Sequence, residues 1–457
     1  MAAIGNKVRL WLWGHRAPLS VFGVAVGMRL LYAWILLPWA AAAFNFDTAP
    51  GTDGYYHIAD CLLQGAGFRF RPDFGETMFR LPGYPLFLCA LWWLFGPTLW
   101  VVQAVQALIG GCTSLLIFHL GKRYFGWLVG LLAGLAFAFW PIDWTVCARY
   151  VTEPLYVFLL VLSLVLLLRL IERPRIGPAV VLGLIMGFAS LVREVNVLLI
   201  PLLVAVVPLL PPAKGRRLKC VAALAATVMI AALVMLPWIV RGYRLTGSLV
   251  LPTTGGGVGL MYTTSLSKHP DYQGDLRDHA RKVLWPEAKE VLFSHGIAEN
   301  SGDYDSTYWW TFMSIKDEVR ANLVLKEKAL EEIRSDPMRF LRTVVGNALG
   351  FWFRGTTVSM SWLARLLFAP LLLMGATGFV ASVRTGQKAA WVLLLLIASL
   401  NLVCAPTVAF VRYTLPATPA LLLLAARGLT CLIPWLRGHE NPDTSTAQES
   451  SARAVIH

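Results

Sequence analysis

Long apolar runs alternate with short polar segments along most of the chain. A helix needs about 20 apolar residues to cross a bilayer. On this basis the pattern predicts ten spans, over 17–43, 98–121, 125–141, 153–171, 177–193, 196–212, 219–241, 361–383, 388–409 and 413–436. The run 85–95 is too short to cross, so we expect an interfacial or re-entrant helix there. The sequence predicts an all-α polytopic membrane protein with about ten transmembrane helices.

The first apolar run resembles a signal peptide at its start, where Lys7, Arg9 and Arg16 precede it. However, the run is too long for the apolar region of a signal peptide, and it has no clear cleavage site. We therefore expect a retained first span.

Two longer polar segments interrupt the spans. The segment 44–97 is predicted to be an external loop within an N-terminal transmembrane region, 1–241, and 242–360 to be a small mixed extracytoplasmic domain. C-terminal transmembrane helices are expected over 361–437 and a disordered cytoplasmic tail over 438–457.

Within the extracytoplasmic domain, two kinds of sequence follow each other. The segment 253–310 is rich in Gly, Tyr, Asp and Trp and is expected to be irregular, whereas apolar residues recur at helical spacing over 322–353. Asp336 and Pro337 should break that helix in two.

Composition supports the membrane assignment. Of the 457 residues, 57% are hydrophobic and 14% charged, whereas a soluble domain carries about 25% charged residues. The seven cysteines lie mostly in apolar runs, which argues against a secreted disulfide scaffold, and they show no metal-ligand spacing. The net charge of +14 does not indicate nucleic-acid binding, because the basic residues lie at the ends of apolar runs.

The basic residues also predict the orientation. They concentrate in the short loops on the side of the N-terminus, among them Lys122, Arg123, Arg384 and Lys388. The positive-inside rule places these loops in the cytoplasm, so 44–97 and 242–360 should lie outside.

The external side then collects an unusual set of charges from six separate segments. Its members are Asp53, Arg80, Asp143, Arg149, Glu153, Arg193, Glu194, Arg241 and Arg412. Each has a local alternative: Asp53 could cap a helix over Tyr55–Leu63, Arg193 and Glu194 could pair, and Arg241 and Arg412 could reach lipid headgroups. Together they predict a pocket for an anion, because arginine suits phosphate geometry. No glycine-rich nucleotide loop follows a strand, so a lipid phosphate is expected.

Several short motifs resemble those of a known family. They include Asp53-x-Tyr55-Tyr56, Arg80-x-Pro82-Gly83-Tyr84-Pro85, Thr152-Glu153-Pro154, Pro237-Trp238-x-x-Arg241 and Arg412-Tyr413-x-x-Pro416. In this order, over roughly 20–436, the sequence resembles the bacterial members of the dolichyl-phosphate-mannose–protein mannosyltransferase superfamily, which includes the aminoarabinose transferases. The resemblance implies the GT-C fold and inverting transfer of a sugar from a polyprenyl-phosphate donor, outside a bacterial inner membrane.

By this resemblance Asp53 matches the catalytic base, and Glu153 a second acid. His57 could share or orient that role. The candidates for binding the donor phosphate are Arg80, Arg149, Arg241 and Arg412, and Tyr55 and Tyr56 could stack on sugar rings.

The sequence departs from the family at two places. Gly54 stands where many relatives have a second acid, and Leu81 where the aminoarabinose enzymes have a lysine. The sequence requires no cofactor, although a divalent metal between Asp53 and Glu153 is possible.

The acceptor stays open among a lipid, a glycan and a protein, and the sugar is not determined. Two alternatives remain. One is an O-antigen polymerase or ligase with a diphosphate-linked donor, and the other is a transporter or flippase of a lipid-linked anion. A transporter should carry charges at mid-membrane, in broken helices and often in inverted repeats, and the predicted charges gather at one end instead.

Overall fold

The computed structural model describes residues 2–44, 53–199, 217–269, 279–297, 314–355, 357–407 and 409–433. In these ranges every regular element is a helix and no strand occurs. This confirms the predicted all-α class, whereas the mixed character expected of 242–360 does not occur in its described part, which is helical. The tail 438–457 lies outside the described residues.

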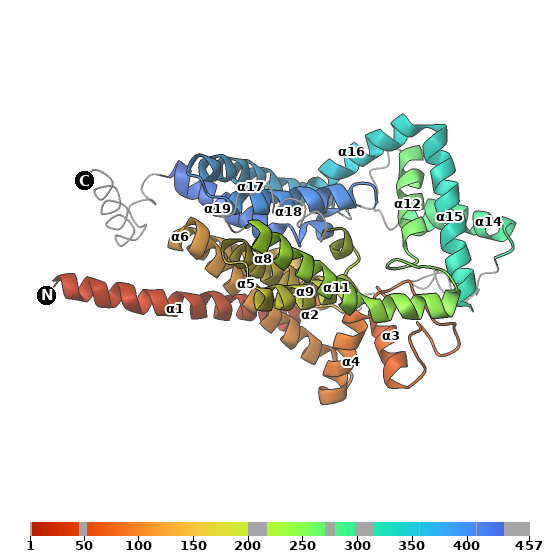
Figure 1. Ribbon diagram of the computed structural model, residues 1–457, viewed down its shortest axis with the longest axis horizontal. Coiled ribbons are helices and arrows are strands. Elements are labelled where there is room, and N and C mark those ends of the chain that lie inside the picture. Colours follow the sequence, from red (N-terminus) through yellow and green to blue (C-terminus); the bar gives the residue numbers. More distant parts are fainter. Residues whose placement is uncertain are drawn as a thin grey trace.

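The N-terminal half forms most of the apolar bundle (Figure 1). The first span continues from α1 through a short π-helix into a third piece. The elements are α1 (Ala2–Leu31), η1 (Tyr32–Leu36), α2 (Leu37–Phe44), α3 (Tyr55–Leu63), α4 (Gly83–Phe95), α5 (Leu99–Phe125), α6 (Trp127–Ala138), α7 (Pro141–Cys147), α8 (Glu153–Glu172), α9 (Ile176–Val192) and α11 (Arg217–Thr246).

The C-terminal half first leaves the bundle and then returns to it. In Figure 1 α12, α14 and α15 lie beyond the bundle at the end opposite the start of α1. The elements are α12 (Gly256–Lys268), η3 (Ala280–Leu284), α14 (Trp285–Ser294), α15 (Ile315–Ser335), α16 (Pro337–Phe353), α17 (Val358–Arg384), α18 (Ala389–Cys404), η4 (Val411–Thr414) and α19 (Thr418–Leu432).

Nine of the ten predicted spans coincide with helices of the described ranges, and 196–212 lies mostly outside them. Among the described residues, five helices are long and apolar enough to cross a membrane, and a sixth span results if α6 and α7, bent by 50°, count as one. The apolar helices α4, α9, α18 and α19 are shorter, at 10–17 residues.

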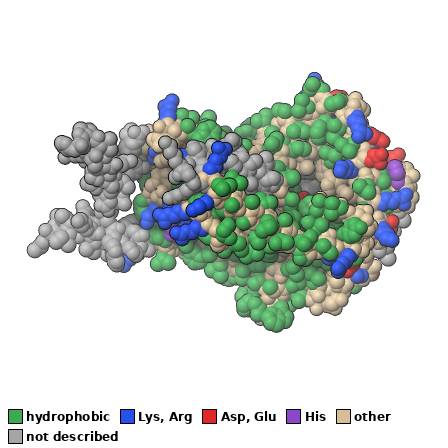
Figure 2. Space-filling model, viewed as in Figure 1, with side chains coloured by type: hydrophobic (Ala, Val, Ile, Leu, Met, Phe, Trp, Pro, Cys, Tyr) green, Lys and Arg blue, Asp and Glu red, His purple; other side chains and the backbone are tan. Residues whose placement is uncertain are grey.

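Small residues allow the bundle helices to approach closely. A Cβ at Gly121 of α5 would lie 2.5 Å from the Cα of Gly130 on α6, and Gly378 and Gly428 fit α17 against α19 in the same way. Close backbone approach of this kind is characteristic of helix packing in membranes. Figure 2 shows hydrophobic side chains over the middle of the molecule and charged ones towards its two ends, as a bilayer-spanning bundle requires.

The expectation of an irregular segment over 253–310 is wrong for its described part, which contains α12, η3 and α14. Gly, Ser and Thr give α12 weak intrinsic helix propensity, but Met261 and Leu266 pack into a core with Leu325 and Ala329 of α15. Tertiary packing therefore overrides local propensity here.

The predicted break at Asp336 and Pro337 is confirmed. α15 ends at Ser335 and α16 begins at Pro337. The Asp336 carboxylate accepts a hydrogen bond from the backbone N–H of Arg339 at 2.9 Å and so caps α16.

A candidate active site at the polar end of the bundle

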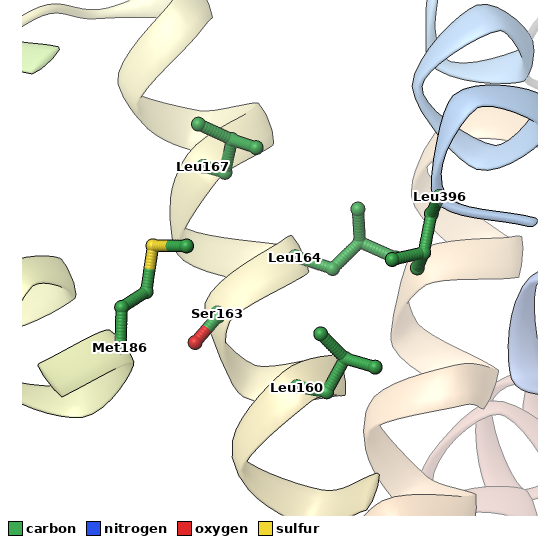
Figure 3. A pocket seen from close by; sticks show the side chains of 6 residues that line it. All are labelled: Leu160, Ser163, Leu164, Leu167, Met186 and Leu396. Carbon is green, nitrogen blue, oxygen red and sulfur yellow. The ribbon is translucent and has the colours of Figure 1, made fainter. Parts of the chain in front are cut away.

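An apolar pocket between α8, α9 and α18 does not carry chemistry. It is lined by Leu160, Ser163, Leu164, Leu167, Met186 and Leu396, with Ser163 as its only polar side chain (Figure 3). The charged residues meet elsewhere, where α8 begins and α9 ends.

Asp53 stands two residues before the start of α3. The N-cap residue of this helix is Gly54, with φ of +83°, and no side chain caps it. A Cβ at Gly54 would overlap the ring of Phe70. The Asp53 carboxylate is thus not consumed as a helix cap, and it faces the last part of the chain instead.

Arg412 of η4 joins the two predicted acids. Its Nη2 donates to Asp53 Oδ2 at 2.5 Å and to Glu153 Oε2 at 3.1 Å, and its Nε donates to Glu153 Oε1 at 2.6 Å. Asp53 and Arg412 each keep 30% of their side-chain surface exposed, while Glu153 keeps 1%. One guanidinium therefore holds both carboxylates at the edge of a solvent-accessible site.

A second guanidinium holds the buried acid. Glu153 is the first residue of α8, and Arg193 follows the end of α9. Arg193 Nη1 lies 2.9 Å from Glu153 Oε1. The Arg193 guanidinium packs against the rings of Tyr156 and Tyr413, at 5.9 and 5.5 Å from their centroids. Arg193 was not among our named phosphate-binding candidates, although it belonged to the predicted charge set.

The arginines determine the protonation of Asp53. Burial alone would raise the pKa of Asp53, but Arg412, Arg80 and Arg193 together lower it to about 2. The carboxylate is consequently ionised at neutral pH. Its Oδ2 is held by Arg412, and Oδ1 has no hydrogen-bond partner among the described residues.

Arg80 is the cation with uncommitted donors. Its Nε donates to the backbone oxygen of Asp53 at 2.8 Å, and its guanidinium packs against the rings of Tyr55 and Phe79 at 5.3 and 4.7 Å from their centroids. Within the described part of the chain its two Nη groups have no hydrogen-bond partner. Arg80 is therefore oriented beside Asp53 and able to bind an anion.

The other two predicted phosphate ligands lie in different surroundings. Arg241 contacts Glu76 at 3.3 Å and the Thr77 carbonyl at 3.2 Å. The Arg149 side chain is exposed, and its carbonyl accepts from Gln106 Nε2 at 2.9 Å. Neither shares a contact with Asp53 in the described structure.

The predicted aromatic and histidine residues have other contacts as well. Tyr55 is buried, and its ring packs against the Arg80 guanidinium. Tyr56 packs against Trp92 and Tyr150 at centroid distances of 5.2 and 5.3 Å. Burial lowers the pKa of His57, and its charged neighbours are Asp60 and Arg71.

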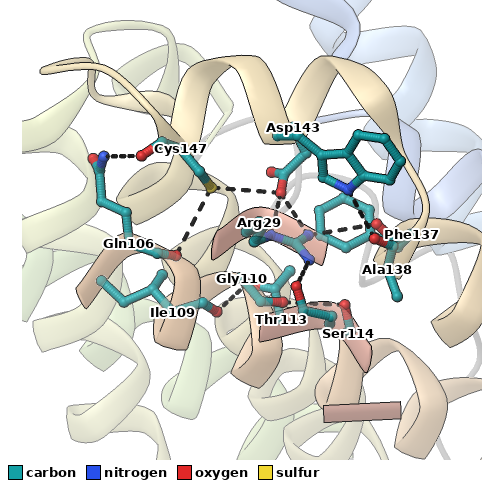
Figure 4. Close-up of polar contacts among 12 residues, drawn as sticks. Arg29, Gln106, Ile109, Gly110, Thr113, Ser114, Phe137, Ala138, Asp143 and Cys147 are labelled. Carbon is teal, nitrogen blue, oxygen red and sulfur yellow. Dashed lines mark hydrogen bonds and ion pairs between the residues drawn. The ribbon is translucent and has the colours of Figure 1, made fainter. Parts of the chain in front are cut away.

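Asp143 belongs to a separate buried ion pair that the sequence analysis missed. Arg29 of α1, fully buried, donates from Nε to Asp143 Oδ2 at 2.6 Å and from Nη1 to the Ala25 carbonyl at 2.7 Å (Figure 4). The signal was present, because an arginine inside an apolar run is costly unless it has a partner.

The residues present do not fit a divalent metal. A guanidinium already occupies the position between Asp53 and Glu153. The backbone at position 54 has no room for the second acid that many relatives have there. The described part of the chain contains no group of three His, Cys, Asp or Glu side chains placed to hold a metal.

Comparisons with known proteins agree with the resemblance of the sequence. Residues 80–240 match the family model described as dolichyl-phosphate-mannose-protein mannosyltransferase. A comparison with curated protein sequences finds no match.

Two solved structures share the fold. The oligosaccharyltransferase AglB from Archaeoglobus fulgidus, in complex with an inhibitory peptide and a dolichol-phosphate, superimposes with a TM-score of 0.56 at 16% identity over 92% of this chain and 50% of its own. The same archaeon's oligosaccharyltransferase, tethered to an acceptor peptide, gives a TM-score of 0.54 at 17% identity, over 89% of this chain and 49% of its own. This chain thus spans about half the length of these enzymes.

A third structure, ArnT from Cupriavidus metallidurans bound to undecaprenyl phosphate, gives a TM-score of 0.40 at 15% identity over 93% of this chain and 79% of its own. The family match and the oligosaccharyltransferase structures together confirm the predicted resemblance and the GT-C fold.

Proposed function

We propose that this chain with the GT-C fold is a membrane glycosyltransferase, which moves a sugar from a polyprenyl-phosphate donor to an acceptor hydroxyl at the extracytoplasmic face. One observation carries the proposal: the ionised Asp53 carboxylate lies near the Arg80 guanidinium, whose two Nη groups have no hydrogen-bond partner among the described residues, at the polar end of an apolar bundle. An anionic lipid headgroup beside a base is the arrangement that such a transfer needs.

The chemistry divides between these two residues. Arg80 donates to the phosphate as its bond to the anomeric carbon breaks and negative charge develops on the leaving oxygen. The acceptor oxygen attacks the anomeric carbon from the opposite face, which inverts its configuration. The acceptor proton passes to Asp53 Oδ1, and polyprenyl phosphate leaves.

The low pKa of Asp53 determines when the proton moves. With a pKa of about 2 the carboxylate is a weak base towards an alcohol. It therefore accepts the proton late, when the sugar has oxocarbenium character and the attacking hydroxyl has become acidic. Arg412 holds Oδ2, so that Oδ1 points to the acceptor side.

The test is transfer in reconstituted membranes with Asp53→Asn, which keeps the size of the side chain and removes its basicity. We expect loss of transfer of at least about a hundredfold with unchanged expression. Asp60→Asn is the matched control, since Asp60 lies on α3 and its exposed bond is to Gln64, and it should retain activity. Full activity of the Asp53→Asn protein would remove Asp53 from the mechanism.

The same assay separates the second candidate function. A diphosphate-linked sugar is supplied beside the monophosphate-linked one, because a polymerase or ligase would use the diphosphate-linked donor. The two Nη groups of Arg80 can bind one phosphate in a bidentate manner. We therefore propose the monophosphate donor, and turnover of the diphosphate-linked sugar alone would favour a polymerase or ligase.

We further propose that the reaction needs no divalent metal, because Arg412 supplies the positive charge between the two acids. A chelator should leave the initial rate unchanged. The acceptor, whether a lipid, a glycan or a protein, is best identified by mass spectrometry of envelope glycolipids and glycoproteins from cells with and without the gene.

A further inference from the structure

The loop before Arg80 is anchored by a buried acid of α15. Glu318, in the first turn of α15, is 2% exposed. Its Oε2 accepts from Thr77 Oγ1 at 2.6 Å, and its Oε1 accepts from the Met78 backbone N–H at 2.9 Å and from Thr254 Oγ1 at 2.5 Å. One carboxylate thus ties α15 to two separate segments.

The anchored loop is held on its other sides as well. The Thr254 N–H donates to the Met78 carbonyl at 3.2 Å, and the Thr77 hydroxyl accepts from the Phe79 N–H at 3.0 Å. Arg241 Nη1 donates to the Thr77 carbonyl at 3.2 Å. The backbone at Thr77 and Met78 therefore has little freedom while Glu318 accepts all three of its bonds.

This loop carries the candidate phosphate ligand. Arg80 follows Met78 by two residues, which an extended chain covers in about 7 Å. Phe79, between them, stacks on the Arg80 guanidinium. A shift at Met78 is passed directly to Arg80, and from its Nε to the Asp53 backbone.

We propose that Glu318 is a positioning residue, which fixes Arg80 against Asp53 by holding Thr77 and Met78 in place. The proposal rests on the function proposed above. It assigns a role to 242–360, which lies outside the residues that match the family model.

Ionisation of Glu318 is central to this role. All three bonds are donated to the carboxylate, and the Met78 N–H can only donate. Burial is the largest influence and raises the pKa of Glu318, and the bonds from Thr254, Thr77 and Met78 and the charge of Arg241 offset that rise only in part. Glutamine keeps the shape but offers one acceptor oxygen instead of two.

The first experiment compares Glu318→Gln with Glu327→Gln, an exposed acid on the same helix. We expect Glu318→Gln to lower kcat/KM for the donor about tenfold and to weaken polyprenyl phosphate binding. Glu327→Gln should behave as wild type. Equal behaviour of the two variants would overturn the proposal.

A double-mutant cycle tests whether Glu318 acts through Arg80. Arg80→Met alone should lower kcat/KM more than Glu318→Gln does, and adding Glu318→Gln to it should change little, because the group being positioned is gone. Independent, additive losses would mean that Glu318 acts by another route.

Hydrogen exchange provides a readout that needs no substrate. Glu318→Gln should speed exchange of the Met78 and Phe79 amides, and Thr254→Val, which removes only one bond to the carboxylate, should do so less. Unchanged exchange would refute the anchoring. If the anchoring holds but wild-type protein neither binds polyprenyl phosphate nor transfers sugar, the proposed function fails and the contact is structural only.

Discussion

Asp53 owes its proposed role to its neighbours. The aspartate of a free peptide has a pKa of about 3.9, and the surrounding guanidinium groups lower that of Asp53 to about 2 despite its burial. Because the shift favours the ionised form, the contribution of this contact to stability is present above the unfolded-state pKa and is lost as the pH falls towards about 2.

Replacing Arg412 by methionine should reverse this shift. Burial would remain while the main cation disappeared, so the pKa of Asp53 should rise above its wild-type value. We expect about a hundredfold lower kcat/KM at neutral pH. We also expect the decrease of kcat/KM on the acid side of its pH profile, the acid limb, to move to higher pH. The pH profile of kcat/KM between about pH 4 and 8 measures this.

The matched control for Arg412 is Arg365→Met, an exposed arginine of α17 that stacks on Trp362. It should keep the wild-type profile. A variant at position 412 with reduced rate but an unshifted acid limb would show that Arg412 does not set the ionisation of Asp53.

Gly54 is a second residue whose identity the site requires. Its φ of +83° is strained for other residues, and a Cβ would overlap Phe70. We expect Gly54→Ala to cost about 1–3 kcal/mol of the free energy of unfolding and to lower activity by displacing Asp53.

A variant at Gly65 separates the cost of backbone strain from the cost of the steric overlap with Phe70. It has φ of +73° but open space around the Cβ position, so Gly65→Ala should cost only the backbone strain. Thermal unfolding in detergent compares the two variants, and equal losses would mean that the contact with Phe70 is unimportant.

At the scale of elements, the sequence predicted where helices end better than it predicted which elements and side chains contact each other. The break of α15 and α16 followed from Asp336 and Pro337, because capping and proline act locally. The helicity of α12 did not follow, since it depends on packing against α15. The pairing of Asp53 with Arg412 could not be predicted either, because 359 residues separate them along the chain.

The pair of Arg29 and Asp143 joins α1 to α7 across the bundle (Figure 4). Asp143→Asn would leave the Arg29 charge buried without its counter-ion. We expect a loss of about 3–5 kcal/mol, the usual cost of breaking a buried pair. The double variant Arg29→Met with Asp143→Leu should recover part of it, because no buried charge remains.

An exposed ion pair supplies the control. Arg71 and Asp73 keep 53% and 58% of their side-chain surface exposed. Asp73→Asn should change stability by less than about 1 kcal/mol. If Asp143→Asn were equally mild in a thermal unfolding assay, the pair would not hold α1 in the bundle.

For the whole molecule, the one-sided distribution of charge was the most useful signal in the sequence. It placed Asp53, Arg80, Glu153 and Arg412 at one end of the bundle, and the structure joins these four through direct contacts. Arg241, predicted with them, instead pairs with Glu76. Periodicity and charge identify the end of a span, whereas the choice among partners at that end depends on how the loops fold.

The orientation of that end in the membrane can be tested directly. Asp73 lies in the loop before Arg80, while Thr385 follows the end of α17 that is remote from α16. In a background without reactive cysteines, we expect Asp73→Cys to react with a membrane-impermeant maleimide in intact cells and Thr385→Cys to react only after lysis. The reverse pattern would place the charged cluster at the cytoplasmic face, where a donor sugar outside the membrane could not reach it.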